Sequence, residues 1–366
     1  MSALSNSNAH TIAVLHGDQT GEELLQEALR VLAPEVIGLT LDFQDFDLSL
    51  ANRRATNNAV VNEAAAAMVQ SGLGFKAATI TPPEQNDVGS PNAILREEID
   101  GTVILRTGRR IHGVRPVGGV HDPISIVRMA VDDAYGAKEW RESTADGDEL
   151  GYRTAKISRK VCRNVAEFAF QLAARTGARV FGGPKYTVSP VYEGMFKEEM
   201  DAAAARHPNV AYDPQLIDAM LALLMKSDGD ALVIPTLNRD GDLVSDLVLQ
   251  MFGSIAGSES LVLAFDDTLQ VKVVMAEAPH GTAPALEGKN LANPMAMILA
   301  GASLLSYIQT PNAGRASRAI YESVFEAVHA GETTTDIGGR LSTTEFTDNV
   351  IERVKAKLEV WKGLRS

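Results

Sequence analysis

Hydrophobic and polar residues follow two alternating periods along the chain, one of about two residues and one near 3.6. A β-rich run at residues 10–16 ends in a glycine, and residues 22–31 then carry apolar side chains at helical spacing. The succession recurs, with helices predicted at 59–69, 159–174 and 241–251 and strands at 76–81, 178–181 and 231–235. Such alternation predicts an α/β fold whose sheet is largely covered by helices.

The length of the chain predicts more than one domain. A chain of 366 residues is too long for one compact core and suits two domains at about 150 residues each. The segment 144–152 is rich in Asp, Glu and Gly and interrupts the periodic pattern in mid-chain. We expect it to be a surface loop rather than a linker between independent domains.

Acidic residues outnumber basic ones, 47 to 34, which gives a formal net charge of −13. Because the basic residues form no long runs, a surface that follows nucleic-acid phosphates is not expected. The first ten residues lack the profile of a secretory signal, and no stretch approaches the roughly 20 apolar residues of a membrane span. A single cysteine, Cys162, cannot form an internal disulfide. These features predict a cytoplasmic protein without nucleic-acid or membrane partners.

Glycine-rich loops offer two places for a nucleotide. The pattern at 72–77 matches the loose dinucleotide fingerprint, but it follows a predicted helix and precedes a predicted strand, so we reject it. The segment 280–294 carries a histidine, small residues and Asn293-Pro294. This composition suits close approach of the backbone to a ligand, although a plain surface loop has the same composition.

Two aspartates form the strongest local pair. Asp242 and Asp246 are four residues apart in a predicted helix, which places both carboxylates on one face within reach of a single hard cation. Asp218, in an amphipathic stretch, could supply a third oxygen. Two or three carboxylates suit Mg²⁺ or Mn²⁺ with retained waters better than Ca²⁺. The alternative is that Asp242 is only a first-turn residue favoured by the helix dipole and that Asp246 is solvated.

Arginines recur between residues 90 and 128, and their guanidinium groups fix carboxylates in two-pronged geometry. Such a set suits a di- or tricarboxylate, although scattered arginines are also ordinary surface residues. The set comprises Arg96, Arg106, Arg115 and Arg128.

Several long motifs, in order, resemble the isocitrate and 3-isopropylmalate dehydrogenase family over nearly the whole chain. They are GDQTGEEL, SPNAILREEIDGTVILR, IVRMAVDDAYG, GPKYTVSPVYEG, NRDGDLVSD, EAPHGTAPALEGKNLANPMAMILAGASLL and DIGGRLSTTEF. The resemblance implies a discontinuous large cofactor-binding domain at 1–102 and 256–366 and a smaller substrate and dimerisation domain at 103–255. It also implies oxidative decarboxylation of a malate-type acid with hydride transfer to a nicotinamide cofactor.

The resemblance assigns roles to individual residues. Arg96, Arg106 and Arg128 would hold the carboxylates of the malate unit, whereas Arg115 receives no assignment. Tyr135 would be the general acid that protonates the enol intermediate, and Lys185 would relay the proton of the 2-hydroxyl. Lys185 and Asp218 would come from the partner subunit, so the resemblance implies a homodimer with shared active sites.

The resemblance also implies a cation and a cofactor. Asp218, Asp242 and Asp246 would hold Mg²⁺ or Mn²⁺. The cofactor loop would be formed by six residues, namely His280, Gly281, Thr282, Ala283, Pro284 and Asn293. At the next two positions Ala285-Leu286 replaces both the aspartate typical of NAD-using members and the Lys-Tyr of bacterial NADP-using members. We favour NAD, with NADP as the alternative, because an unpaired 2′-phosphate would lose a charge-assisted contact.

The residues before the first arginine indicate the substrate. Ser90 and Asn92 precede Arg96 in a pattern that resembles the S-x-N-x-x-x-R of isocitrate dehydrogenases, and both can donate hydrogen bonds to a distal carboxylate. Isocitrate or a close acidic analogue is therefore the first candidate. Met129-Ala130 and Thr187 depart from the family pattern, which leaves 3-isopropylmalate, homoisocitrate, tartrate-like, dimethylmalate-like and phosphonate analogues open. A non-catalytic regulatory subunit of the same fold is the alternative from another class.

Overall fold

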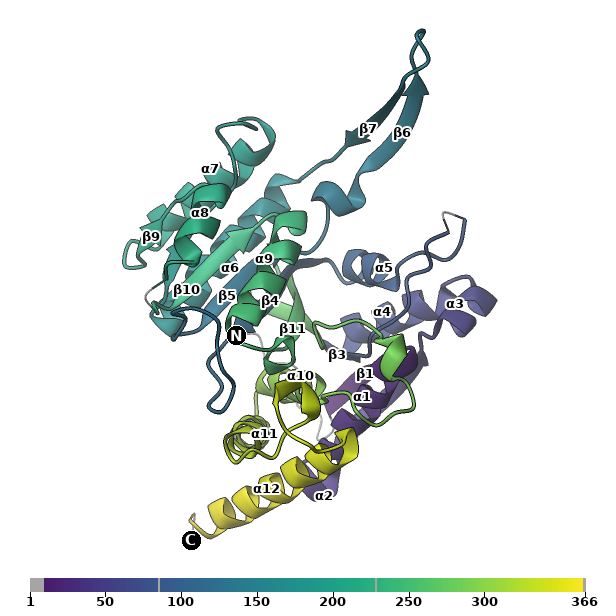
Figure 1. The fold of residues 1–366 in the computed structure, drawn as a ribbon, viewed down its shortest axis with the longest axis vertical. Coiled ribbons are helices and arrows are strands. Elements are labelled where there is room, and N and C mark those ends of the chain that lie inside the picture. The colour runs from purple at the N-terminus through teal and green to yellow at the C-terminus, as the bar shows by residue number, and fades with distance from the viewer. Residues whose placement is uncertain (1–9, 85, 228, 365–366) are drawn as a thin grey trace. The chain divides into compact units, whose positions relative to one another are not determined.

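The structure is a computed structural model that describes residues 10–84, 86–227 and 229–364 (Figure 1). The chain divides into two compact units, which are described separately. Unit 1 comprises residues 1–101, 106–117 and 248–366, and unit 2 comprises residues 102–105 and 118–247. Both units are built from strands and helices, so the predicted α/β class is confirmed. The domain boundaries expected at 102/103 and 255/256 stay a prediction.

Unit 1 contains a mixed sheet in the strand order β2-β1-β3-β12-β11. The strands are β1 (His10–His16), β2 (Leu41–Asp47), β3 (Leu73–Lys76), β11 (Ser260–Phe265) and β12 (Val271–Glu277). β1 runs parallel to β2 and β3, β3 runs parallel to β12, and β11 is antiparallel to β12. The parallel arrangement places the carboxyl ends of β1, β3 and β12 at one edge, where ligands bind in open α/β sheets.

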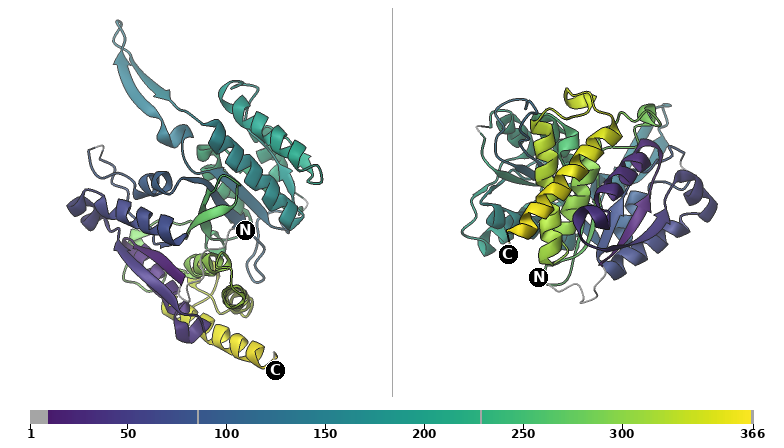
Figure 2. Two further views of the ribbon diagram at one scale, coloured as in Figure 1. Left: turned by 180° about the vertical axis from the view of Figure 1, so that it is seen from behind. Right: turned by 90° about the horizontal axis from the view of Figure 1, so that it is seen from below.

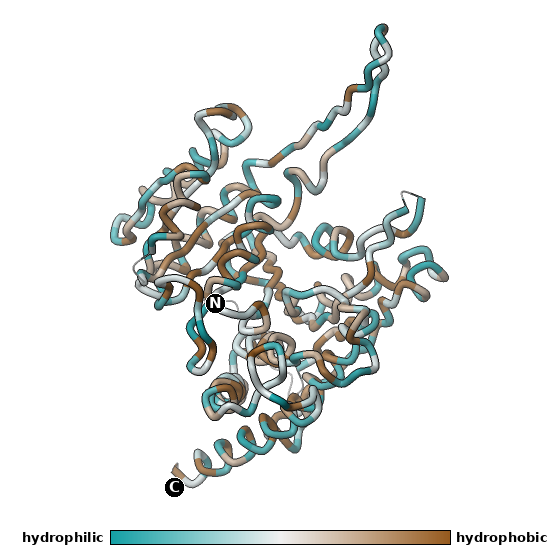
Figure 3. The backbone as a smooth tube through the Cα atoms, in the orientation of Figure 1, coloured by the Kyte–Doolittle hydropathy of each residue, from teal (hydrophilic) through white to brown (hydrophobic). Residues whose placement is uncertain are grey.

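Unit 1 contains helices that pack on its sheet and on one another. They are α1 (Gln19–Val31), α2 (Pro34–Ile37), α3 (Leu50–Thr56), α4 (Ala59–Ser71), α5 (Pro91–Glu98), α10 (Met295–Ser306), α11 (Pro311–His329) and α12 (Thr343–Gly363). α10 is apolar and buried over nearly its whole length, and it contacts α1, α11, β3 and β12. α12 lies across α11, as the right view of Figure 2 shows, and its hydropathy alternates along the helix (Figure 3). The core of unit 1 therefore lies between the sheet and the helices that pack on it, chiefly α10 and α4.

Unit 2 contains a parallel sheet in the order β5-β10-β8-β9. These strands are β5 (Ile124–Met129), β8 (Arg179–Phe181), β9 (Tyr212–Asp213) and β10 (Leu232–Thr236). Its helices are α6 (Arg159–Thr176), α7 (Tyr192–Arg206), α8 (Ile217–Leu224) and the first part of α9 (Asn238–Met251). α6 packs on the strands, and α7 lies beside α6 (Figure 2, left). Residues 102–105 of β4 (Gly101–Gly108) also belong to this unit.

Most predicted elements are confirmed, but the strand expected at 76–81 is wrong. The strand β3 ends at Lys76, and residues 77–81 form a loop. The backbone N–H of Ile80 bonds to the carboxylate of Asp18, and the carbonyl of Ile80 bonds to Arg53. Because these side chains satisfy the backbone N–H and carbonyl of Ile80, the segment does not need a neighbouring strand to supply its hydrogen bonds. The apolar composition alone could not reveal these partners.

The segment 144–152 is exposed as expected, but it is not simply a loop. β6 (Lys138–Ser143) and β7 (Glu149–Thr154) form an antiparallel hairpin around a turn, which projects from unit 2 in Figure 1. Trp140 pairs with Tyr152, and their rings stack with centroids 5.1 Å apart. The cross-strand aromatic pair stabilises the hairpin, whereas its abundant charges had indicated a loop. Among the described residues, no helix combines the length and apolar character needed to cross a membrane.

The rejected glycine pattern lies between a helix and a strand, as its sequence context indicated. Gly72 ends α4 in the left-handed region at φ 78°, and β3 begins at the next residue. A dinucleotide fingerprint requires the reverse order, strand before helix. The pattern is therefore a helix cap followed by a strand.

Candidate active site

The aspartate pair lies on α9, which follows β10 at the carboxyl end of the parallel strands of unit 2. The helix confirms the predicted spacing, and the carboxylates of Asp242 and Asp246 are half-buried and exposed, respectively. Gly241 lets the helix approach β5, because an added Cβ would lie 2.7 Å from the Cβ of Arg128 and 2.3 Å from Oγ1 of Thr236. The start of α9 is therefore packed directly against the residues that end β5 and β10.

Arg128 and Tyr135 converge on Asp242. Arg128 is buried near the end of β5, and its Nη1 donates to Oδ1 of Asp242. Tyr135 lies in the short 3₁₀ helix η1 (Asp133–Gly136), and its hydroxyl donates to Oδ2 of Asp242 at 2.7 Å. The Tyr135 side chain is about half exposed; partial desolvation, and next the hydrogen bond to Asp242, raises the pKa of its phenol. Tyr135 therefore keeps its proton at neutral pH and can donate it.

Lys185 and Asp218 form a second pair in unit 2. Lys185 follows β8, and its Nζ donates to Oδ2 of Asp218, in the first turn of α8, at 2.6 Å. The hydrogen bond from Lys185 lowers the pKa of the Asp218 carboxyl. Within the described ranges of one chain, no three His, Cys, Asp or Glu side chains are grouped so that they could hold a metal ion. The structure therefore does not bring Asp218 together with Asp242 and Asp246 in one copy.

The candidate substrate residues of unit 1 lie on α5 and β4, and two of them are arginines that act on a buried carboxylate. Ser90 is the N-cap of α5, Asn92 lies in its first turn, and Arg96 lies in its last turn. Arg106 is buried in β4, where its Nε donates to Oγ of Ser260 at 3.3 Å. Both arginines are close enough to act on Glu277, which ends β12.

Lys76 completes this cluster and was not singled out in the sequence. Its Nζ lies 3.3 Å from Oε2 of Glu277, and the two residues pair in register at the ends of β3 and β12. Although burial opposes ionisation of Glu277, the charges of Lys76, Arg96 and Arg106 lower the pKa of its carboxyl. The signal available in the sequence was a charged residue at the end of each of two apolar strands.

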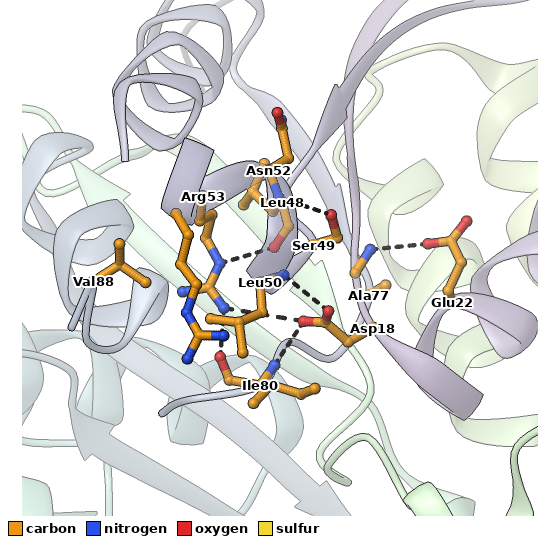
Figure 4. Close-up of polar contacts among 12 residues, drawn as sticks. Asp18, Glu22, Leu48, Ser49, Leu50, Asn52, Arg53, Ala77, Ile80 and Val88 are labelled. Carbon is orange, nitrogen blue, oxygen red and sulfur yellow. Dashed lines mark hydrogen bonds and ion pairs between the residues drawn. The ribbon is translucent and has the colours of Figure 1, made fainter. Parts of the chain in front are cut away.

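Arg53, which the sequence reasoning also missed, holds the loop that leads to the substrate residues (Figure 4). Its side chain is fully buried although it belongs to the short helix α3. Its guanidinium donates to the carbonyls of Leu48 at 2.9 Å, Ile80 at 2.5 Å and Gly89 at 3.1 Å. Ile80 and Gly89 lie near the two ends of the loop that precedes Ser90. One side chain therefore constrains the loop at two points.

Asp18 fixes the same loop from the turn between β1 and α1. Its Oδ1 accepts from the backbone N–H of Leu50 at 2.9 Å, and its Oδ2 accepts from that of Ile80 at 2.8 Å (Figure 4). Gly17 allows the close approach of the turn, because an added Cβ would lie 2.1 Å from the carbonyl oxygen of Ala78. A glycine is required at this position for steric reasons.

The candidate cofactor loop rests on the first turns of α1. Oγ1 of Thr20 donates to the carbonyl of Ala283 at 2.8 Å, and the backbone N–H of Gly288 donates to Oε1 of Glu23 at 2.7 Å. Ala283 has φ 43°, a conformation that non-glycine residues adopt only when their surroundings hold it. Gly281, Ala283 and Pro284 are exposed, and Thr282 is half-buried. The loop is thus held by hydrogen bonds to α1, and its residues 281, 283 and 284 are exposed to a ligand.

Two further residues frame this loop. Burial lowers the pKa of the His280 imidazole, whose Nδ1 lies 3.0 Å from the carbonyl oxygen of Gly281. Asn293 is buried, accepts from the backbone N–H of Met295 at 3.0 Å and donates to Asp336 at 3.0 Å. His280 is therefore neutral at neutral pH, and Asn293 anchors the end of the loop to α10.

Comparisons with known proteins agree with these motifs. The family described as isocitrate/isopropylmalate dehydrogenase matches residues 11–350. The chain is 28% identical to a 3-isopropylmalate dehydrogenase of Methanothermobacter thermautotrophicus, over 94% of this chain and 98% of the relative. It is 29% identical to an NADP isocitrate dehydrogenase of Sphingobium yanoikuyae, over 88% and 91% of the two chains. The crystal structure of isocitrate dehydrogenase from Methylococcus capsulatus shares the fold, with a TM-score of 0.82 at 23% identity over 94% of this chain and 99% of that one.

Proposed function

The chain belongs to the isocitrate/isopropylmalate dehydrogenase family of NAD(P)-dependent dehydrogenases, and we propose that it catalyses the metal-dependent oxidative decarboxylation of a 3-substituted malate. Isocitrate or a close acidic analogue is the first candidate substrate. The observation that carries the proposal is the convergence of Arg128 and Tyr135 on Asp242, which places a carboxylate-binding group and a proton donor beside a candidate metal ligand.

Positive charge in both units supports a substrate with several carboxylates. In unit 1 the three cations Lys76, Arg96 and Arg106 face the single carboxylate of Glu277. In unit 2 the guanidinium of Arg128, near the end of β5, is buried. We assign Arg96, Arg106 and Arg128 to the carboxylates of the malate unit, and Ser90 and Asn92 to the group on C3. Arginine suits this role because its planar guanidinium binds carboxylates with two parallel hydrogen bonds.

The carboxylates of α9 fit a small divalent cation. Two aspartates on one helix face, one half-buried and one exposed, leave the remaining positions to water and substrate, as Mg²⁺ and Mn²⁺ require. Asp218 of the partner subunit would complete the set. When bound, the cation would stabilise negative charge on the substrate and the nicotinamide would accept a hydride from C2. NAD is the favoured nucleotide, because Ala285 and Leu286 offer no positive charge to a 2′-phosphate.

The remaining chemistry falls to two proton-transfer groups. Lys185 of the partner subunit would relay the proton of the 2-hydroxyl as the hydride leaves C2. The bond between C3 and its carboxylate then breaks, carbon dioxide leaves, and the electron pair remains as an enolate. Tyr135, whose phenol is protonated at neutral pH, then donates its proton to C3. Asp242 orients that phenol through the 2.7 Å hydrogen bond.

A homodimer with shared sites is supported by the apolar surface around these residues. Leu243 and Leu247 on α9 flank the two aspartates, with exposed fractions of 66% and 39%. Leu223 and Met225, at the end of α8, are also exposed. Exposed apolar groups gathered on helices indicate an interface, since they gain stability when a second copy covers them. Such an interface would bring Asp218 of one copy toward the α9 aspartates of the other.

One assay tests the proposal. The wild-type protein is incubated with isocitrate, homoisocitrate, 3-isopropylmalate or tartrate, with NAD⁺ or NADP⁺ and with Mg²⁺, Mn²⁺ or chelator, while reduced nucleotide and carbon dioxide are measured. We expect equal amounts of both products with one acid, and no turnover with chelator. No turnover with any acid would favour the non-catalytic subunit, and turnover without carbon dioxide would indicate a simple hydroxy-acid dehydrogenase.

Two variants test the residue assignment. Lys185→Met and Asp246→Asn should abolish turnover while the far-ultraviolet circular dichroism stays that of the wild type. Asp230→Asn is the matched control, because Asp230 is an exposed aspartate of unit 2 that pairs with Arg179. Wild-type activity in either of the first two variants would contradict the assignment.

A further inference from the structure

We propose that Asn238 and Asp133 are positioning residues, which hold the carboxylate-binding Arg128 and the proton donor Tyr135 in register with the aspartates of α9. We assign them no contact with the substrate. Their role rests on the proposed function, and it identifies the residues that set the positions of Arg128 and Tyr135 relative to α9.

Asn238, the first residue of α9, joins two segments that carry active-site residues. Its side chain is buried, with an exposed fraction of 1%. Its Oδ1 accepts from Nε and Nη2 of Arg128 at 3.0 and 2.9 Å, and its Nδ2 donates to the carbonyl of Asp132 at 3.0 Å. An amide side chain offers an acceptor oxygen and a donor nitrogen together. Asn238 therefore connects the orientation of Arg128 to the turn that precedes Tyr135.

Asp133 joins the same turn to two helices. Its carboxylate is buried and accepts from the hydroxyl of Tyr192 on α7 and from the backbone N–H of Arg239 on α9, both at 2.9 Å. Its own N–H donates to the carbonyl of Lys156 at 2.8 Å. The Arg239 N–H lies in the first turn of α9, where amides have no partner within the helix. The carboxylate thus satisfies the helix end and attaches η1 to it.

The backbone of this turn adopts conformations that its residues disfavour. Asp132 has φ 60° and ψ −157°, a region occupied almost only by glycine, and Asp133 has φ 59°. Such conformations persist only where the surrounding contacts impose them. The contacts made by Asn238, Tyr192 and the N–H of Arg239 supply this constraint. When they are removed, we expect the turn to relax and the Tyr135 hydroxyl to move.

A small movement has a large kinetic effect, because a misplacement of about 1 Å can cost on the order of 100-fold in rate. Two separate consequences follow. Loss of the Asn238 contacts disturbs Arg128 and therefore substrate affinity as well as turnover. The Tyr192 hydroxyl contacts Asp133 and the carbonyl of Lys156 but not Arg128, so its loss should lower turnover more than substrate affinity.

The experiment compares Asn238→Ala and Tyr192→Phe with the wild-type enzyme, using the acid that the wild type oxidises. We expect Asn238→Ala to raise KM for the acid about tenfold and to lower kcat. We expect Tyr192→Phe to lower kcat about three- to tenfold and to leave KM for the acid and for the nucleotide within twofold. Tyr152→Phe is the control, since it removes a phenol hydroxyl from the exposed hairpin of the same unit.

A second readout separates positioning from a general structural defect. The 3-carboxy-2-oxo acid intermediate, supplied directly, can be reduced with NAD(P)H or can lose carbon dioxide, and only the second route needs the proton of Tyr135. Tyr192→Phe should therefore slow carbon dioxide release while reduction stays within twofold of wild type. Equal losses on both routes would overturn the positioning role.

The outcomes distinguish this inference from the proposed function. An inactive wild-type protein refutes the proposed function. An active wild type with both Asn238→Ala and Tyr192→Phe within twofold in every parameter refutes the inference alone. If Asn238→Ala does not fold, the conservative Tyr192→Phe decides the question, because it removes a single hydroxyl and keeps the ring.

Discussion

Replacement of Arg53 by methionine should destabilise unit 1 strongly. The guanidinium is fully buried and donates to the carbonyls of Leu48, Ile80 and Gly89, and it lies 4.0 Å from a carboxylate oxygen of Asp18. Methionine is unbranched and can fill much of the space left by the aliphatic part of the arginine. It supplies no donor, so the buried acceptors lose their partners.

The magnitude follows from the number and burial of these contacts. Hydrogen bonds that involve a charged group contribute about 1.5–3 kcal/mol each, so the three bonds of Arg53 set an upper bound of about 9 kcal/mol. Contributions within one network do not add fully, and the variant no longer bears the cost of burying a charge. We therefore expect a loss of about 4 kcal/mol in the free energy of unfolding, within the roughly 3–5 kcal/mol observed when a buried pair is broken.

The assay is urea and thermal unfolding followed by circular dichroism, with Arg318→Gln as the control. Arg318 lies on α11, and its exposed guanidinium pairs with Glu322 on the same helix. Exposed ion pairs contribute little, so the control should unfold at the wild-type midpoint. Arg53→Met should lower the thermal midpoint by about 8–16 °C, at about 2–4 °C for each kcal/mol in a unit of this size.

A kinetic measurement tests the functional part of the reasoning. Because Arg53 constrains the loop that precedes Ser90, KM for the acid should rise in Arg53→Met at temperatures where the variant is folded. Arg318→Gln, which does not touch this loop, should leave KM unchanged. A stability loss below about 1 kcal/mol would show that solvent or neighbouring groups satisfy the freed carbonyls. Equal effects of the two substitutions would refute the argument from burial.

Two further predictions concern pH and assembly. The hydrogen bond from His16 to Glu22 is the main cause that raises the pKa of His16 to about 9. The protonated His16 therefore contributes its full stabilisation below about pH 6.5, and this stabilisation is lost as the pH rises through 9. The difference in urea midpoint between wild type and His16→Gln should accordingly shrink between pH 7 and 10; a constant difference would contradict the assignment. Leu243→Glu should yield an inactive monomer in analytical ultracentrifugation, because a carboxylate would have to be buried in the proposed interface. Val360→Glu, an equally exposed position on α12, should leave assembly and activity intact, and a dimeric Leu243→Glu would refute the interface.

The parts of the site that were predictable depend on local spacing or on continuous motifs. The helical spacing of Asp242 and Asp246 could be inferred because a helix places residues four apart on one face. Tyr135, Arg128 and Lys185 lie in motifs that resemble a known family, and the family match confirms that resemblance. Their individual roles stay predictions. The strand expected at 76–81 was wrong because the partners of its backbone lie in other segments.

The contacts that hold the site residues in place could not be predicted, because they join residues that are distant along the chain. Lys76 and Glu277 are 201 residues apart and meet only because β3 and β12 are neighbouring strands. Asn238 reaches the carbonyl of Asp132 across 106 residues, at the shared carboxyl end of parallel strands. Such contacts are set by strand order, on which the local sequence pattern carries no information.

The sequence by itself determined the α/β class, the carboxylate pair of α9 and the family, since each depends on periodicity or on contiguous motifs. Only the tertiary structure decided that Arg128 and Tyr135 share Asp242, that Arg53 is buried beneath a loop, and that Asp132 and Asp133 adopt a strained turn. The physical reason is that burying a charged side chain, or holding a residue in a strained backbone conformation, costs free energy. That cost is offset only by hydrogen-bonding partners that the folded chain brings within reach.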